Sequence, residues 1–167
     1  MKKLIIFLLM ILPLGAFAQE MKVAIVNSQE IMSVMPELTA MQETLKQMND
    51  KYAGEMKTME DEWQKKYADY IAQQDSMTEN IKVRRMQELQ DIEQRVQNFT
   101  QVAQQDMQKK QQELLAPIQE KLRVAIKAVG DEKGYTYILD NNPGIVLYTG
   151  NSAIDATPLV KAKLGLK

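Results

Sequence analysis

Apolar residues recur every three or four positions over most of the chain. From Leu38 onward most steps are of three or four residues, and the positions between them are mainly Gln, Lys, Glu and Asp. This pattern is typical of a helix with one apolar stripe that packs along a second helix. The first stretch of the stripe is Leu38, Met41, Leu45, Met48, Tyr52, Met56, Met59, Trp63, Tyr67 and Tyr70. The second is Ile81, Met86, Leu89, Ile92, Val96, Phe99, Ala103, Met107, Leu114, Ile118, Leu122, Ala125 and Val129.

The stripe is interrupted at residues 73–76, near its middle. Folding the chain there gives two antiparallel helices and places Leu38 opposite Leu114. Residues 37–75 carry five basic and nine acidic side chains, whereas residues 76–129 carry nine basic and seven acidic ones. These opposite net charges, −4 and +2, favour side-by-side packing. The alternative is one uninterrupted helix in a parallel coiled coil, and the break and the charges favour the hairpin.

A short strand and a short helix precede the long helices. Residues 22–27 are rich in Val and Ile, and the turn residues Asn27 and Ser28 close the run, which predicts a strand. Asn27 with Glu30 three residues later is the spacing of a helix cap, so a short helix is expected over residues 28–34. Pro36 suits the first turn of the next helix, because its missing N–H has no partner there in any case.

Two further strands and a final helix are predicted after the long helices. Residues 135–139 and 145–148 are mostly β-branched or aromatic and are separated by Asp-Asn-Asn-Pro-Gly, which predicts a β-hairpin. A helix over residues 159–164 follows, with Asp155 or Thr157 as its cap.

This order predicts an α+β fold in which both ends of the chain form one small sheet. The predicted body comprises residues 19–35 and 130–167, and the helical hairpin arm comprises residues 36–129, with its tip near 73–78. Three short strands and a small helix bury little surface, and the chain has no Cys for a disulfide. We therefore expect the protein to be oligomeric. The body residues expected to contribute are Val23, Ile25, Tyr137, Leu139, Val146 and Tyr148.

The N-terminus has the pattern of a cleaved secretory signal. Lys2 and Lys3 precede an apolar segment at 4–14, and Ala16-Phe17-Ala18 fits a signal peptidase site. Cleavage after residue 18 predicts an exported protein, periplasmic in a cell with two membranes; a retained anchor helix is the alternative. Without the two lysines, the 21 basic residues become 19 against 22 acidic ones, a net charge of −3. This balance gives no indication of nucleic-acid binding.

The composition also argues against an enzyme. The chain has no Cys and no His, which excludes Cys nucleophiles, Ser–His pairs and the usual zinc ligands. Its carboxylates fall on the polar sides of predicted helices, where solvated charge is the ordinary role. No catalytic residue, cofactor site or metal site is predicted.

Together these features resemble the Skp/OmpH family of periplasmic chaperones over residues 21–164. The segments that carry the resemblance are KVAIVNSQEI, DMQKKQQELLAPI, EKGYTYILD and AIDATPLV. The family implies a homotrimer with a small central barrel and three helical arms around a cavity. It also implies an ATP-independent holdase that keeps unfolded outer-membrane proteins from aggregating. Well-known members are basic, so the net charge of −3 implies weakened contact with a membrane surface.

Several apolar arm residues are candidates for contact with unfolded clients. Met is flexible and polarizable, so it adapts to partners of irregular shape. The candidates are Met48, Met56, Met59, Trp63, Tyr67, Tyr70, Met77 and Met86. Packing between the two arm helices is the favoured alternative for most of them.

A second candidate is a basic cluster expected near the tip, formed by Lys65, Lys66, Lys82, Arg84 and Arg85. It would attract acidic segments or lipid head groups, but neighbouring Glu and Asp residues are expected to neutralise it. A structural coiled-coil protein of the cell envelope, or a subunit of a larger complex with one specific partner, is the alternative function.

Overall fold

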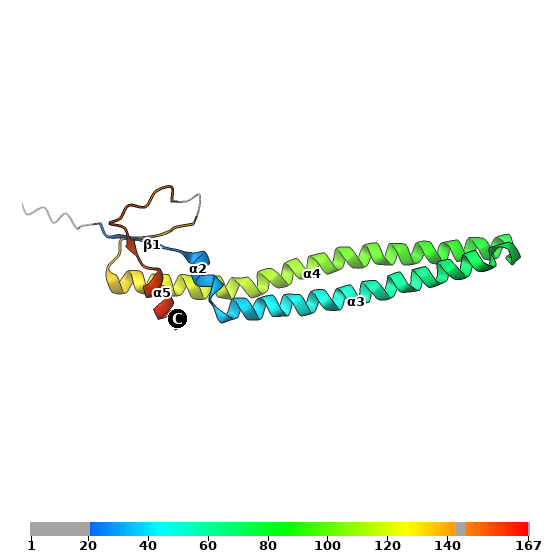
Figure 1. Cartoon of the computed structure of the whole chain (residues 1–167), viewed down its shortest axis with the longest axis horizontal. Helices are drawn as coiled ribbons and strands as arrows, with labels where there is room; N and C mark the ends of the chain where they lie inside the picture. Colours follow the sequence, from blue (N-terminus) through cyan, green and yellow to red (C-terminus); the bar gives the residue numbers. More distant parts are fainter. Residues whose placement is uncertain (1–20, 143–145, 167) are drawn as a thin grey trace, which may run out of the picture.

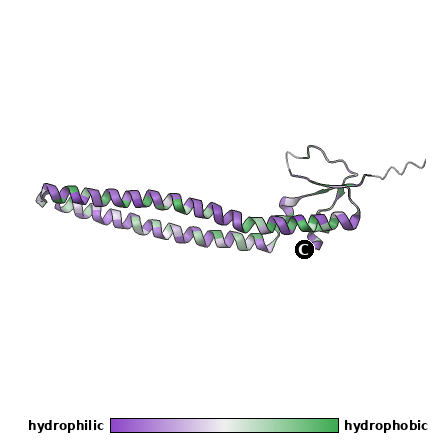
Figure 2. Cartoon of the chain, turned by 180° about the vertical axis from the view of Figure 1, so that it is seen from behind, coloured by the Kyte–Doolittle hydropathy of each residue, from purple (hydrophilic) through white to green (hydrophobic). Residues whose placement is uncertain are grey.

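The computed structural model describes residues 21–142 and 146–166, so the predicted signal peptide at residues 1–18 lies outside the described residues. The described chain consists of a small body at one end and a long arm of two helices (Figure 1). Hydrophobic residues are interspersed with hydrophilic ones along both arm helices (Figure 2). The predicted fold class is confirmed: a small β-sheet body, a long helical hairpin arm and a short C-terminal helix.

The chain enters the body through strand β1 (Val23–Val26) and helix α2 (Ser28–Ser33). The side-chain oxygen of Asn27 accepts a hydrogen bond of 3.0 Å from the backbone N–H of Glu30, which is the predicted cap. The backbone N–H of Asn27 donates instead to Oγ1 of Thr157, at 2.9 Å. This bond ties the start of α2 to the C-terminal part of the chain.

The arm is formed by helices α3 (Pro36–Gln73) and α4 (Glu79–Lys133), joined through the 3₁₀ turn η1 (Gln74–Ser76). Pro36 begins α3, as predicted. Gly134 ends α4 in the left-handed conformation, with φ of 66°, and its N–H donates to the carbonyl of Gly130. A side chain at Gly134 would be strained there, so glycine fixes where the helix stops.

Contacts between α3 and α4 show that the two helices run antiparallel. Near the body, Lys121 pairs with Glu37, and near the tip, Lys66 pairs with Glu88 at 3.5 Å. At the base of the arm one hydrophobic cluster contains Met35, Leu38, Met41, Leu114 and Ile118. The hairpin is therefore confirmed over the single uninterrupted helix, and Leu38 and Leu114 share a cluster as the apolar stripe predicts.

The sheet is parallel, with strand order β2-β1-β3. Strand β2 spans Tyr137–Asp140 and strand β3 spans Ile154–Asp155. The predicted β-hairpin between residues 135–139 and 145–148 is wrong: residues 146–148 are not in a strand, and residue 145 lies outside the described residues. The third strand is formed further along the chain.

Pairing along β1 explains this difference. A hairpin after β2 would leave one edge of β1 without partners, whereas β3 supplies them. The N–H of Ala156, just after β3, donates to the carbonyl of Ile25 at 2.8 Å, and the N–H of Asn141, just after β2, donates to the carbonyl of Val26 at 2.7 Å. The central strand is thus hydrogen-bonded on both sides.

Helix α5 (Thr157–Lys163) closes the body against α2 and α4. The carboxylate of Asp155 accepts a hydrogen bond of 2.8 Å from the N–H of Thr157. Lys161 pairs with Glu30 at 2.6 Å, which joins α5 to α2. The buried core of the body is Ala24, Val26, Ile31, Leu122, Ala125, Val129, Ala156 and Val160.

Candidate functional site

The aromatic residues of α3 lie partly in the seam between the arm helices and partly on the surface. Trp63 and Tyr67 stack, with ring centroids 5.0 Å apart and an interplanar angle of 10°. Nε1 of Trp63 donates a hydrogen bond of 3.1 Å across the seam to Glu93 of α4. Tyr67 is 43% exposed. Trp63 therefore helps to hold the hairpin together, whereas Tyr67 presents its ring to the surroundings.

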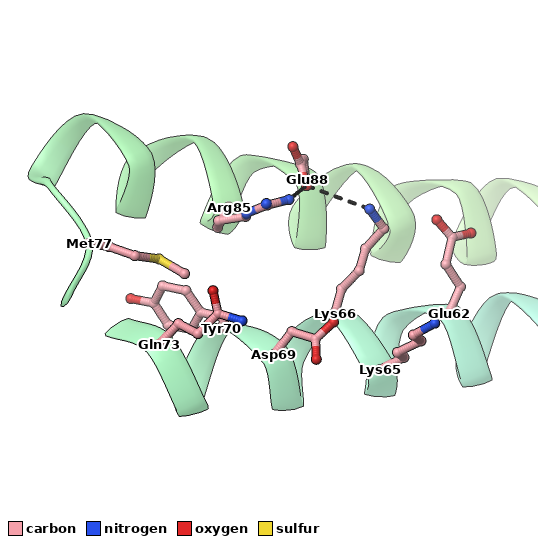
Figure 3. A pocket seen from close by; sticks show the side chains of 9 residues that line it. All are labelled: Glu62, Lys65, Lys66, Asp69, Tyr70, Gln73, Met77, Arg85 and Glu88. Atoms are coloured by element: carbon pink, nitrogen blue, oxygen red, sulfur yellow. Dashed lines mark hydrogen bonds and ion pairs between the residues drawn. The ribbon is translucent and has the colours of Figure 1, made fainter. Parts of the chain in front are cut away.

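The methionine candidates divide in the same way. Met48, Met56 and Met59 are half-buried at positions that face α4. Met77 lies in the connection after η1 and its side chain points toward Tyr70 (Figure 3). Met86 of α4 is 42% exposed. The first three fit the seam, and Met86 is available to a partner.

The middle of the arm is loosely filled. Tyr52 packs edge-on against Phe99 at 5.7 Å, and its hydroxyl donates to Asp106 at 2.9 Å. This hydrogen bond is the main cause of the raised pKa of Tyr52. A groove of about 550 Å³ lies beside these residues, with Met56 and Met107 among its lining. The seam here is held by a few polar and aromatic contacts rather than by continuous burial.

The basic cluster near the tip is organised around one carboxylate. Glu88 pairs with Arg85 at 2.9 Å, with Arg84 at 3.3 Å and with Lys66 at 3.5 Å. The hydrogen bond from Arg85 is the main cause that lowers the pKa of Glu88 below its usual value. Three of the five predicted cations thus share one anion.

A cleft of about 350 Å³ opens beside this cluster, between α3 and α4 (Figure 3). Its charged lining residues are Glu62, Lys65, Lys66, Asp69, Arg85 and Glu88. Basic and acidic groups are equal in number there. Of the other two predicted cations, Lys65 lines the cleft and Lys82 pairs with Glu79 at 2.9 Å, and this carboxylate is the main cause that raises the pKa of Lys82.

The predicted body residues of β1 and β2 lie on one face of the sheet. Val23 is in register with Tyr137 and Ile25 with Leu139, so their side chains share a side. Val23, Tyr137 and Leu139 are exposed, Tyr137 by 57%. The alternate residues of β1 point into the core on the other side. One face of the sheet is therefore covered by helices and the other is an open apolar surface.

The segment between β2 and β3 adds to this apolar surface. Val146 is half-buried, but Leu147 is 93% and Tyr148 is 85% exposed. Two such large apolar side chains in succession are unusual on an isolated soluble chain and indicate a partner surface.

Two kinds of site are not found in the described part of the chain. Residues 21–142 and 146–166 contain no cluster of three or more His, Cys, Asp or Glu side chains suited to a metal ion. Nor do they include a helix with the length and apolar character needed to span a bilayer.

Comparison with known proteins decides the family. The sequence matches the family described as outer membrane protein (OmpH-like) over residues 22–164. The chain belongs to the OmpH-like family. This confirms the resemblance to the Skp/OmpH family, and because that family is not enzymatic, the prediction that the protein is not an enzyme is confirmed as well.

Among solved structures, this OmpH-like chain is similar to the crystal structure of a candidate outer membrane chaperone (OmpH-like) from Caulobacter crescentus CB15. The TM-score is 0.75 and the sequence identity is 19%, with 85% of this chain and 82% of that chain covered. At this identity the similarity establishes a shared fold. No curated protein matches the sequence.

Sequence reasoning missed two exposed residues near the tip. Ile71 of α3 is 44% exposed and Val83 of α4 is 68% exposed. Both lie outside the apolar stripe. A signal was present in the spacing, because Ile71 continues the four-residue steps from Trp63 through Tyr67.

Proposed function

We propose that the protein is an ATP-independent holdase that binds unfolded outer-membrane proteins and prevents their aggregation. One structural observation carries the proposal: a long helical hairpin with exposed apolar side chains stands away from a small body (Figure 1). A holdase needs adaptable apolar surface that tolerates many partners rather than a fixed pocket. Membership of the OmpH-like family supports this use of the arm.

The proposal includes a homotrimer built on the body. A single arm cannot enclose a client, and the open sheet face would be covered by other copies of the chain. Tyr137 and Leu139 on β2, with Leu147 and Tyr148 beyond it, supply the apolar area. Burying them would compensate for the small core of the isolated body. Three arms would then surround a common cavity, as the family implies.

The proposed location is the periplasm. The pattern of residues 1–18 predicts export through a cleaved signal, and outer-membrane clients pass through this compartment. Attraction to anionic lipid is a minor part of the proposal. The basic residues near the tip are mostly paired with carboxylates, and the net charge after cleavage is −3.

The test is an aggregation assay with the chain from residue 19 to 167. A urea-denatured outer-membrane barrel protein is diluted into buffer without nucleotide, and light scattering is followed with and without the chain. We expect scattering to be suppressed for several unrelated barrel proteins. Unchanged scattering, together with binding to one folded partner only, would instead support the structural coiled-coil protein.

A further inference from the structure

The two sides of the arm near its tip differ in chemistry. On one side of the seam, ion pairs join the helices: Arg95 with Glu62 at 3.2 Å and Lys66 with Glu88 at 3.5 Å. This side also carries the charged cleft shown in Figure 3. Ile81 is exposed, and it lies two turns before Glu88 on the same side of α4. We call this side of the seam the ion-paired side.

The opposite side of the seam carries a groove of about 300 Å³ beside Trp63. Trp63 and Val96 supply its apolar wall, and Gln64 and Gln97 supply neutral polar groups. Its acidic residues are Glu60 and Glu93. Glu93 already accepts the hydrogen bond from the indole of Trp63. The groove therefore offers apolar surface edged by amides.

Exposed apolar residues extend this groove toward the tip. Trp63, Tyr67 and Ile71 follow at intervals of four residues, which places them in a row along one flank of α3. On α4, Met86 lies two turns before the groove, on the flank at the same side of the seam as this row. Val83 lies at the outer edge of that flank. Tyr67, Ile71 and Met86 are each more than two-fifths exposed. We call these five residues the apolar tip face.

The spacing of this row matches an extended chain. Residues four apart on a helix are separated by about 6 Å along its axis. Alternate residues of a β-strand, which lie on the same side, are separated by about 6.6–6.8 Å. Over the two steps from Trp63 to Ile71 the mismatch is only about 1.5 Å, within the reach of flexible side chains.

We propose that the apolar tip face binds the lipid-facing side chains of unfolded transmembrane β-strands, one apolar side chain of the client beside each residue of the row. Such strands alternate apolar and polar residues over about ten positions. Their polar residues would then point away from the arm. This inference rests on the proposed holdase function and names the surface that recognises the client.

The charge distribution favours this occupant over an acidic or anionic one. The cleft on the ion-paired side is lined by three basic and three acidic side chains, so it has little net charge to attract a ligand. Binding through the apolar tip face would change little with ionic strength, because salt screens charges and does not weaken apolar contact.

The test compares three variants with the wild-type chain. In the first, Tyr67→Gln, Ile71→Gln and Met86→Gln replace three of the five residues of the apolar tip face; Gln is a good helix former and Trp63 is left in place to hold the seam. The matched control, Ile81→Gln, Val102→Gln and Val124→Gln, removes three apolar residues of similar exposure elsewhere. The charge variant carries Lys66→Gln, Arg84→Gln and Arg85→Gln. Circular dichroism and thermal unfolding establish that each is folded.

Affinity is measured by fluorescence anisotropy with a labelled, urea-denatured barrel protein at low and high salt. We expect the first variant to bind at least about tenfold more weakly, and the other two to stay within about twofold of wild type. A ten-residue peptide with alternating apolar and polar residues should compete better than a peptide of the same composition with its apolar residues in one block.

The outcomes separate this inference from the proposed function. If the first variant binds the client as tightly as the wild-type chain does, the inference is overturned, but the holdase function is not. An equal loss in the charge variant, with strong salt dependence, would also overturn it. Wild-type protein that binds no denatured barrel protein would overturn both.

Discussion

Replacing Gly54 with alanine should stiffen the arm. Gly54 lies in the interior of α3 and is exposed, and a Cβ atom built there would meet no other atom within 4 Å. Glycine in a helix interior lowers stability by about 0.5–1 kcal/mol relative to alanine, because a glycine has more conformational freedom in the unfolded chain and loses it when the helix forms. The free energy of unfolding should rise by the whole of this difference in the Gly54→Ala variant, since the added Cβ atom causes no strain.

The arm can be followed locally by amide hydrogen exchange. Few arm residues are fully buried, so we expect the helices to open locally before the body unfolds. A gain of 0.5–1 kcal/mol corresponds to about two- to fivefold slower exchange for amides around residue 54. Circular dichroism in urea should show a matching rise in the unfolding midpoint.

The end of α4 offers a control in which a glycine-to-alanine change should lower stability rather than raise it. Gly134 has a φ of 66°, where a Cβ atom is strained, so Gly134→Ala should lower stability by about 1–2 kcal/mol. Unchanged or faster exchange near residue 54 in Gly54→Ala would refute the reasoning, because it would mean that α3 is not a continuous helix there in solution.

Three further changes test other parts of the structure. Ile31→Ala removes a side chain with no exposure, so urea unfolding should show a loss of about 2–5 kcal/mol; a loss below about 1 kcal/mol would contradict the described core. Hydrogen bonds from Lys121 and Arg85 lower the pKa values of Glu37 and Glu88. The stability that these two ion pairs add is therefore present at neutral pH, and it is lost as the pH falls below about 4.5 and through the lowered pKa values. A urea midpoint that is equal at neutral and acid pH would count against these pairs. Tyr137→Ser with Leu139→Ser should dissociate the oligomer in sedimentation velocity, and an unchanged sedimentation coefficient would exclude the open sheet face as the interface.

The arm could be predicted from the sequence because its cause is local and periodic. A long, narrow stripe in steps of three and four is suited to packing along a second helix, and the break at residues 73–76 leaves the chain room to turn. Asn27 with Glu30, and Pro36, marked helix starts for equally local reasons. Each of these features depends on neighbouring residues alone.

The sheet could not be predicted in the same way. Residues 145–148 have high β propensity, yet the described part of this segment stays outside the sheet while Ile154 and Asp155 pair with β1. Strand pairing depends on which backbone groups still need partners, and this is decided by residues far apart in sequence. Residues 146–148 have the composition of a strand, and the exposed Leu147 and Tyr148 among them are suited to contact with a partner.

The candidate site was predicted in composition but not in arrangement. The aromatic and methionine residues of α3 were identified, but spacing alone could not tell Trp63, held in the seam, from Tyr67, which is exposed. Likewise, the basic residues near the tip were identified, but their sharing of Glu88 depends on the register between α3 and α4. That register is fixed by packing along the whole arm.

Native mass spectrometry of the chain from residue 19 to 167, alone and with one urea-denatured outer-membrane barrel protein, tests the central claim most directly. The holdase account predicts the mass of three chains, which shifts by one client without nucleotide. A trimer that ignores the client would contradict the chaperone function, and a stable folded monomer would contradict the oligomeric body on which the account depends.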